Sequence, residues 1–177
     1  SFVMPVFVMP VQAQNVLRSQ TVSFDSYAAL KAVPFERFYD GAAAIVVNRR
    51  RAGTFIKNGS DLSALVAIDT AECVVIPSPP ATAGSSGGWV RKEWLQQGHP
   101  IRAEWCGLFI NGTNSDHIGL KAALAVAETG SREVLLPAGN MALASGQSLT
   151  MDWVGAVVRG QGRENTIITS LGGTTPP

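Results

Sequence analysis

Cysteine is scarce in this chain, which has only two in 177 residues. So small a number excludes a disulfide framework of the kind that holds small secreted domains together. Cys73 and Cys106 could form one bond. Because the sequence shows no recognisable secretion signal, we expect two buried, reduced thiols instead.

An excess of charge of either sign is also missing. Fourteen Lys and Arg against 13 Asp and Glu leave a formal net charge of +1. Such a balance gives no field to hold a polyanion, so we expect no nucleic-acid partner. The two histidines, His99 and His117, are too few and too isolated for a metal site. We therefore expect no metal and no cofactor.

The N-terminal segment lacks charge altogether until Arg18. It contains a tandem pentapeptide, Phe2–Val6 followed by Phe7–Val11, with a proline in each copy. The prolines and the short apolar run exclude a membrane span, and proline favours an extended peptide. Such a peptide could lie on a partner chain or form an edge strand on the chain's own core. The candidate partner contacts are Phe2, Val6, Phe7 and Val11.

The next part is rich in turns, in keeping with 18 glycines and 10 prolines in the chain. We expect a helix over 27–33, capped by Asp25 or Ser26, and then a hairpin with strands at 42–47 and 53–56. The hairpin turn contains Arg49–Arg51, which could hold a phosphate or a sugar acid. Without further clustered bases or interleaved aromatics, we expect a solvated turn. Further strands are expected at 66–68, 73–77 and 89–91.

Beyond residue 97 a helix is followed only by short strands and turns. We expect Ser115 to cap a helix that carries Ile118, Ala122, Ala125 and Val126 on one face, with Leu120 and Leu124 beside them, and ends at Gly130. The strands are expected at 134–136, 141–143, 148–151, 156–159 and 166–168. Their even spacing is typical of a parallel β-helix, in which one coil cannot bury its apolar face alone.

These residues carry a resemblance to phage tailspikes. Val134–Gly139 and Val157–Arg163 resemble the first coil of the pectate-lyase-like right-handed β-helix. Trp105–Leu108 and Asn111–Asp116 are similar to the motifs that precede its helix in that family, with departures at Cys106 and Ser115. Upstream, the sequence resembles the small β domain that many tailspikes place before the β-helix, at Asp40–Gly41, Gly53–Phe55, Asp69, Ile76–Pro77 and Gly88–Arg91.

The resemblance implies a mostly β chain in three parts. Residues 1–34 would form an extended N-terminal anchoring segment with a short helix, 35–96 a small all-β module, and 97–177 the capping helix and first coils of a right-handed parallel β-helix. It also implies a homotrimer in the virion, bound by its N-terminus to tail, baseplate or adaptor proteins. Coils beyond residue 177 would bind and depolymerise a host surface polysaccharide.

Catalytic residues are not expected within 1–177. Glycoside hydrolysis needs two converging carboxylates, and the spacing of the acids in the β-helix part brings no pair together. Trp94 and Trp105 are candidate trimer contacts, because aromatic area near the entry to the first coil can tie chains together. The alternative is a fragment of an exported bacterial polysaccharide lyase or glycoside hydrolase of the β-helix class, which would be extracellular or periplasmic. The acids considered are Glu128, Glu133, Asp152 and Glu164.

Overall fold

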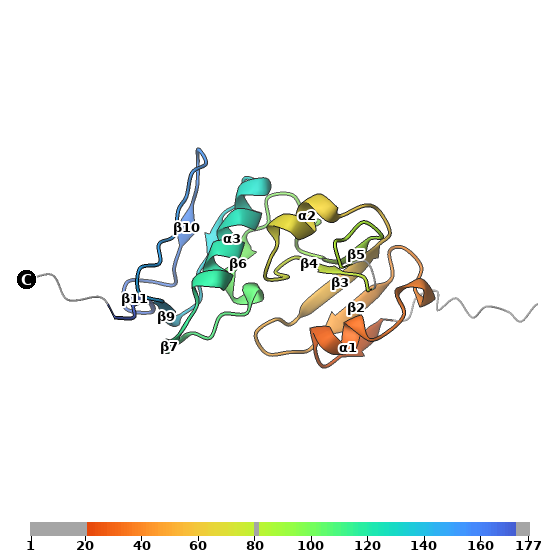
Figure 1. Ribbon diagram of the computed structural model, residues 1–177, viewed down its shortest axis with the longest axis horizontal. Coiled ribbons are helices and arrows are strands. Elements are labelled where there is room, and N and C mark those ends of the chain that lie inside the picture. The colour runs from red at the N-terminus through yellow and green to blue at the C-terminus, as the bar shows by residue number, and fades with distance from the viewer. Residues whose placement is uncertain (1–20, 80–81, 173–177) are drawn as a thin grey trace, which may run out of the picture.

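A computed structural model describes residues 21–79 and 82–172, and within them the fold is mainly β (Figure 1). The partner contacts expected near the N-terminus, Phe2, Val6, Phe7 and Val11, lie outside these residues. None of the helices within the two ranges is long and apolar enough to cross a membrane. In chain order the elements are β1 (Val22–Phe24), α1 (Tyr27–Lys31), η1 (Phe35–Arg37), β2 (Ala43–Val46), β3 (Gly53–Asn58), α2 (Ser63–Ile68), β4 (Val75–Pro77), β5 (Gly88–Arg91), β6 (Ile101–Arg102), η2 (Ala103–Cys106), β7 (Asn111–Ser115), α3 (His117–Thr129), β8 (Val134–Leu135), β9 (Gly139–Leu143), β10 (Val158–Arg159) and β11 (Thr166–Ser170).

The first half of the chain forms a five-stranded sheet in the order β1-β2-β3-β5-β4. The expected hairpin is confirmed, since β2 and β3 pair antiparallel across the Arg49–Arg51 turn. The expected helix is confirmed as α1, which Ser26 caps by accepting a hydrogen bond from the Ala29 amide at 3.1 Å. Strand β1 pairs parallel to β2 and so belongs to this sheet, and α1 packs on the same core, although the sequence analysis placed both in the N-terminal segment.

Residues 66–68 are not the expected strand but the end of α2. A short apolar run fits a strand or a helix equally well, so periodicity could not separate the two. The deciding signal lies just upstream, where Asp61 accepts a hydrogen bond from the Ser63 amide at 2.8 Å and turns the chain into the helix.

The second half forms two three-stranded sheets, with the orders β6-β8-β10 and β7-β9-β11. All pairs in both sheets are parallel, so successive passes of the chain lie side by side, with a shift of register in the β7–β9 pair between Asn111 and Ser115. The expected strands at 134–136, 141–143, 156–159 and 166–168 correspond to parts of β8 to β11. The expected strand at 148–151 is wrong, because these residues form no ladder.

Helix α3 packs its buried side chains against the apolar side of these parallel sheets. Its N-cap is Asp116, not Ser115 as expected from the sequence. The expected inner face is also partly wrong, because Ile118 is 73% exposed while Leu120, Leu124 and Val126 are buried. The Ser115 hydroxyl instead accepts hydrogen bonds from the amides of His117 and Ala144.

Two apolar cores result, one on each half of the chain. The five-stranded sheet and α3 with its parallel sheets lie at opposite ends of the long axis, and α2 contacts α3 where they meet (Figure 1). Cys73 and Val74 stand next to β4 in sequence, yet their side chains belong to the core of the second half. The boundary between the cores therefore passes through the chain just before β4.

Buried Asp116 joins the start of α3 to the strands on either side. Its carboxylate accepts hydrogen bonds from the amides of Phe109 at 2.5 Å, Ile110 at 3.4 Å and Ala142 at 3.1 Å. Ile110 has a φ of 55°, a conformation that is unfavourable for a β-branched residue. The Asp116 carboxylate therefore stabilises a strained turn as well as the contact between α3 and β9.

Replacing Asp116 by alanine is expected to lower the free energy of unfolding by about 3 kcal/mol, because buried amides lose their acceptor. Urea denaturation measures the loss. The matched control is Asp152→Ala, which removes an exposed carboxylate and should change stability by no more than about 0.5 kcal/mol. Equal stability of the two variants would show that Asp116 does not have this role.

Candidate functional site

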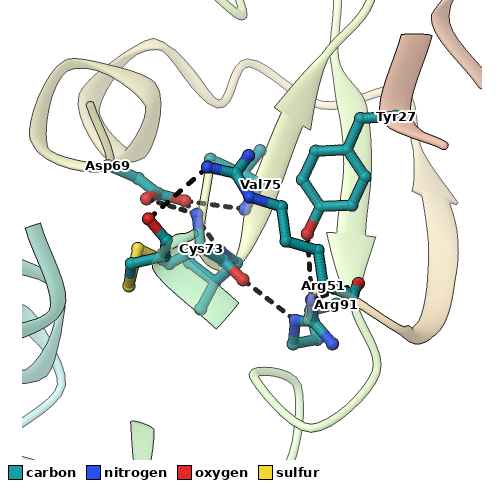
Figure 2. The surroundings of a disulfide bond; sticks show 8 residues. Tyr27, Arg51, Asp69, Cys73, Val75 and Arg91 are labelled. Atoms are coloured by element: carbon teal, nitrogen blue, oxygen red, sulfur yellow. Dashed lines mark hydrogen bonds between the residues drawn. A yellow bond between two sulfur atoms is a disulfide. The ribbon is translucent and has the colours of Figure 1, made fainter. Parts of the chain in front are cut away.

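The most elaborate cluster of polar groups in the described residues lies where the two cores meet, around Arg91 at the end of β5. This side chain is fully buried. Its guanidinium donates hydrogen bonds to the carbonyls of Cys73 at 2.9 Å, Ala52 at 2.9 Å and Arg51 at 3.2 Å. It also donates to the Tyr27 hydroxyl at 2.9 Å (Figure 2). A single side chain thus connects α1, the β2–β3 turn and the segment before β4.

Aromatic rings from both cores flank the same guanidinium. Its central carbon lies 4.6 Å from the ring centre of Phe55, on β3, and 4.5 Å from that of Trp105, in η2. Burial lowers the pKa of Arg91 from its ordinary value, while the charges of Glu93 and Asp69 oppose that change. Burial also raises the pKa of Tyr27, which keeps its phenol protonated. Because a guanidinium stays protonated in proteins, Arg91 bridges the two cores as a cation.

Close approach of the guanidinium depends on Gly53, the first residue of β3. A Cβ at this position would collide with Nη1 of Arg91. The Gly53–Phe55 motif quoted in the sequence analysis thus has a physical reason, because only glycine leaves room for the arginine beside the backbone.

Asp69 fixes the backbone on the other side of this cluster. The carboxylate, only 2% exposed, accepts hydrogen bonds from the amides of Cys73 at 2.7 Å, Val74 at 2.7 Å and Val75 at 2.9 Å (Figure 2). Burial raises the pKa of Asp69 above its ordinary value, and the three amides act against that rise. The chain that enters β4 is held by this carboxylate and by Arg91 together.

Cys73 and Cys106 form a disulfide, so the expectation of two reduced thiols is wrong. Their Cα atoms lie 4.4 Å apart, and the bond joins the segment before β4 to η2. Spacing in the sequence could not reveal the bond, because only the fold brings the two residues together. The disulfide ties the first half of the chain covalently to the core of the second.

The Arg49–Arg51 turn is exposed at Arg49 and Arg50, as expected of a solvated turn, but it also makes contacts that the sequence did not predict. Arg50 donates a hydrogen bond to the Leu108 carbonyl at 3.0 Å, and Arg51 donates to the Cys106 carbonyl at 3.4 Å. Gly107 between these carbonyls has a φ of 79°, and a Cβ there would collide with the Arg51 guanidinium. The basic turn is therefore a docking element between the two halves, and only Arg49 has no described partner.

The two candidate trimer contacts, Trp94 and Trp105, lie close to this junction, but they differ in how far their side chains are buried. Trp105 is 6% exposed and packs within its own chain between Arg91 and His99. Trp94 is half-buried, with the Arg132 guanidinium 4.2 Å from its ring centre. Most of the Trp105 surface is thus used by intrachain contacts, whereas Trp94 keeps an accessible part.

The acidic residues considered for catalysis lie apart from this cluster. Glu133 forms a bidentate ion pair with Arg159, at 2.7 and 2.8 Å. Asp152 is exposed, as are Glu128 and Glu164. Residues 21–79 and 82–172 contain no group of three or more His, Cys, Asp or Glu that could hold a metal ion.

The arrangement at the junction serves to hold two cores together by hydrogen bonds, a disulfide and cation–π contacts.

An apolar pocket opens at the other end of the second core. It has a volume of about 140 Å³ and lies beside β10 and β11, the outer strands of the two parallel sheets. Met151 and Val158 in its lining are exposed, as is Ile167 beside Ile168 on β11. The lining residues are Leu120, Leu124, Val134, Leu136, Leu149, Met151, Val158 and Ile168.

Sequence reasoning missed the buried charged residues. Arg91 and Asp69 were noted only as members of a resembling motif, and Asp116 as part of a stretch before the helix. A charged residue at the end of an apolar strand, such as Arg91 after Trp89 and Val90, was the available signal, because burial of the strand would carry the charge inside.

A scan against models of known protein families found no match to this chain, and neither did a search of curated proteins.

Removing the disulfide by the double substitution Cys73→Ala and Cys106→Ala is expected to lower the free energy of unfolding by about 4 kcal/mol. The two residues are 33 positions apart, so their bond restricts a sizeable loop in the unfolded chain. Urea denaturation of the variant and of the wild-type protein, with and without dithiothreitol, measures the effect. Reductant should destabilise the wild type alone, and an unchanged wild-type midpoint in reductant would contradict the disulfide.

The substitution Arg91→Lys is expected to cost about 3 kcal/mol of stability, although it conserves the charge. A single ammonium group cannot serve three carbonyls and a phenol, so buried acceptors remain unpaired. Urea denaturation measures the change, and Arg163→Lys, at an exposed arginine, is the matched control. If both substitutions have the same small effect, the hydrogen bonds of Arg91 do not stabilise the junction.

Proposed function

We propose that this chain is the N-terminal part of a phage tailspike and attaches the spike to the virion tail. In this proposal residues 97–177 begin a right-handed parallel β-helix, whose later coils bind and depolymerise a host surface polysaccharide. The observation that carries it is the order of the elements: a small sheet comes first, and then two sheets in which every strand pair is parallel, with α3 between their first and second strands. Several residues of the tailspike-like motifs lie at the junction between these parts, among them Asp69, Arg91 and Trp105.

The open apolar end of the second core supports a continuing β-helix. Strands β10 and β11 each have a free edge within their sheets. Beside them lies the pocket of about 140 Å³, and Ile167 and Ile168 are each 43% exposed. In a β-helix the next coil covers such a surface and pairs with such edges. The proposal therefore assigns this end to a further coil of the same fold.

Surface residues near the junction support the proposed homotrimer. Leu95 is 54% exposed, next to half-buried Trp94, and Phe109 is 44% exposed. A three-fold axis near this segment would bury these side chains together and present three identical N-terminal peptides to a tail or baseplate protein. Trp105 would contribute by supporting this surface from within its own chain.

The disulfide favours a second candidate, an exported bacterial polysaccharide lyase or hydrolase of the β-helix class. Disulfides persist in oxidising surroundings, which include the extracellular space and the periplasm as well as the surface of a virion. The tailspike remains the better proposal, because the order of the N-terminal motifs, the small sheet and the parallel sheets all agree with it.

Light scattering and tail reconstitution test the proposal. We expect the intact protein to be a trimer at micromolar concentration and to sediment with tails that lack their spike. Changing Phe2, Val6, Phe7 and Val11 together to serine should remove most of this binding, because the variant loses its apolar contact surface.

The matched control is Val154→Ser, which changes a fully exposed apolar residue far from the N-terminus in sequence. This variant should bind tails as the wild type does. A monomeric protein, or a quadruple variant that still binds tails, would contradict the tailspike proposal. A monomer whose longer natural chain releases reducing sugar from polysaccharide would favour the exported enzyme.

A further inference from the structure

The disulfide between Cys73 and Cys106 is shielded by the structure around it. Cys73 is fully buried and Cys106 is only 3% exposed. Both side chains belong to the second core, in which α3 packs against η2. A reducing thiolate has to reach a sulfur atom of the bond, so the rate of reduction depends on access as well as on the thiolate. The closed structure gives such a thiolate almost no access to this bond.

The backbone on each side of the bond is held by arginines of the first half. Arg91 donates a hydrogen bond to the Cys73 carbonyl at 2.9 Å, and Arg51 donates one to the Cys106 carbonyl at 3.4 Å. Arg50 donates to the carbonyl two residues after Cys106, at 3.0 Å. If the two halves moved apart, the hydrogen bonds of Arg50 and Arg51 would be lost together with the contact of Arg91 to the aromatic ring in η2.

The two halves have the properties of separate folding units. Within the described residues, the first core and the second core share no buried side chain. The connector at 92–100, described throughout, contains no helix or strand. The described residues before this connector that pack into the second core are Cys73, Val74 and apolar side chains within 65–71. Units that share few contacts open from one another at a lower free-energy cost than that of complete unfolding.

We propose that the disulfide is a redox latch on the junction between the two halves. In the oxidised protein the bond keeps the halves together, and a reductant reaches it only while the junction is open. In the reduced protein the halves separate reversibly, and the contacts of Arg91 and of the basic turn set how often they do so. The latch rests on the junction alone and does not depend on the proposed tail attachment.

Reduction by a dithiol such as dithiothreitol takes two exchange steps. One dithiothreitol thiolate attacks a cysteine sulfur, the protein S–S bond breaks, and the other cysteine leaves as a thiolate. The second dithiothreitol thiolate then attacks the mixed disulfide, closes a cyclic disulfide and releases the first cysteine. The dithiol is oxidised by two electrons, which reduce the protein disulfide, and its two protons pass to the two cysteine thiolates.

Reduction of the folded 177-residue protein by dithiothreitol tests the latch. The thiols released at each time are trapped with iodoacetamide and counted by mass spectrometry. We expect the folded protein to be reduced at least about 100-fold more slowly than the same protein unfolded in urea, because the junction opens only briefly. Equal rates in the two conditions would overturn the proposal.

Variants of the junction should change this rate. Arg91→Lys should speed reduction at least about tenfold and Arg50→Ala about threefold, because each loses contacts that keep the junction closed. The matched control, Arg163→Lys, replaces an exposed arginine between β10 and β11 and should leave the rate unchanged. Because Arg50 is exposed, its variant should keep the fold, and reduction of this variant at the wild-type rate would contradict the latch.

A weakened first core distinguishes opening of the junction from unfolding of the whole chain. Phe38→Ala removes a ring whose centre lies 5.0 Å from that of Trp89 within the first core. This variant should be less stable in urea, yet its rate of reduction in buffer should stay within about twofold of the wild-type rate. Acceleration as large as that by Arg91→Lys would show that reduction requires complete unfolding, and the latch would be wrong.

Labelling of the reduced protein tests the opening itself. Separation of the halves exposes Cys73 and Cys106 together, whereas fraying of η2 exposes Cys106 alone. We therefore expect iodoacetamide to label both thiols of the reduced, folded protein at equal rates, once each rate is divided by that of the same thiol in urea. Labelling of Cys106 at least about tenfold faster than Cys73 would assign the opening to η2 and overturn the proposal.

Discussion

The buried guanidinium of Arg91 is the constraint on which the rest of this structure depends. Taking a cation out of water is costly, and only complete hydrogen bonding makes the burial tolerable. Arg91 meets this condition with three carbonyls, a phenol and two aromatic rings, and these partners come from α1, β3, the β2–β3 turn, η2 and the segment before β4. Each must reach its place for the charge to be buried, so one side chain couples the folding of both cores.

The other features of the junction act on the same short pieces of backbone. Cys73 offers its carbonyl to Arg91, donates its amide to Asp69 and forms the disulfide to Cys106. Cys106 in turn accepts a hydrogen bond from Arg51. Interactions that share a residue are not additive, because loss of one leaves the others to hold the same atoms. The disulfide therefore secures a geometry that hydrogen bonds already define.

Much of the local structure was predictable from the sequence, because it is encoded by neighbours. The α1 helix, the β2–β3 hairpin and most later strands follow from capping residues, turn residues and apolar runs. Predictions failed where contacts distant in sequence decide. From the sequence, the three arginines of the turn look like a solvated charge run, but Cys106 at the end of η2 and Leu108 just after it supply carbonyls for Arg51 and Arg50. The cysteines look unrelated until the segment before β4 meets η2, and the Ser115 hydroxyl, expected to cap the helix, accepts a hydrogen bond from the amide of Ala144, which is distant in sequence.

The two ends of the parallel sheets differ in a way that follows from this junction. At the end formed by β6, the side chains of Cys73 and Val74 and residues of α2 extend the second core, and Arg132 holds the connector through the carbonyls of Trp94, Gln96 and His99. At the other end, β10 and β11 keep free edges beside an open apolar pocket. Stacked parallel strands need a cover at their first edge, since an open apolar edge invites unwanted pairing. The five-stranded half packs against the second core on the β6 side, where the buried arginine and the disulfide keep it attached, so a continuation of the proposed kind would extend from the β10 and β11 side.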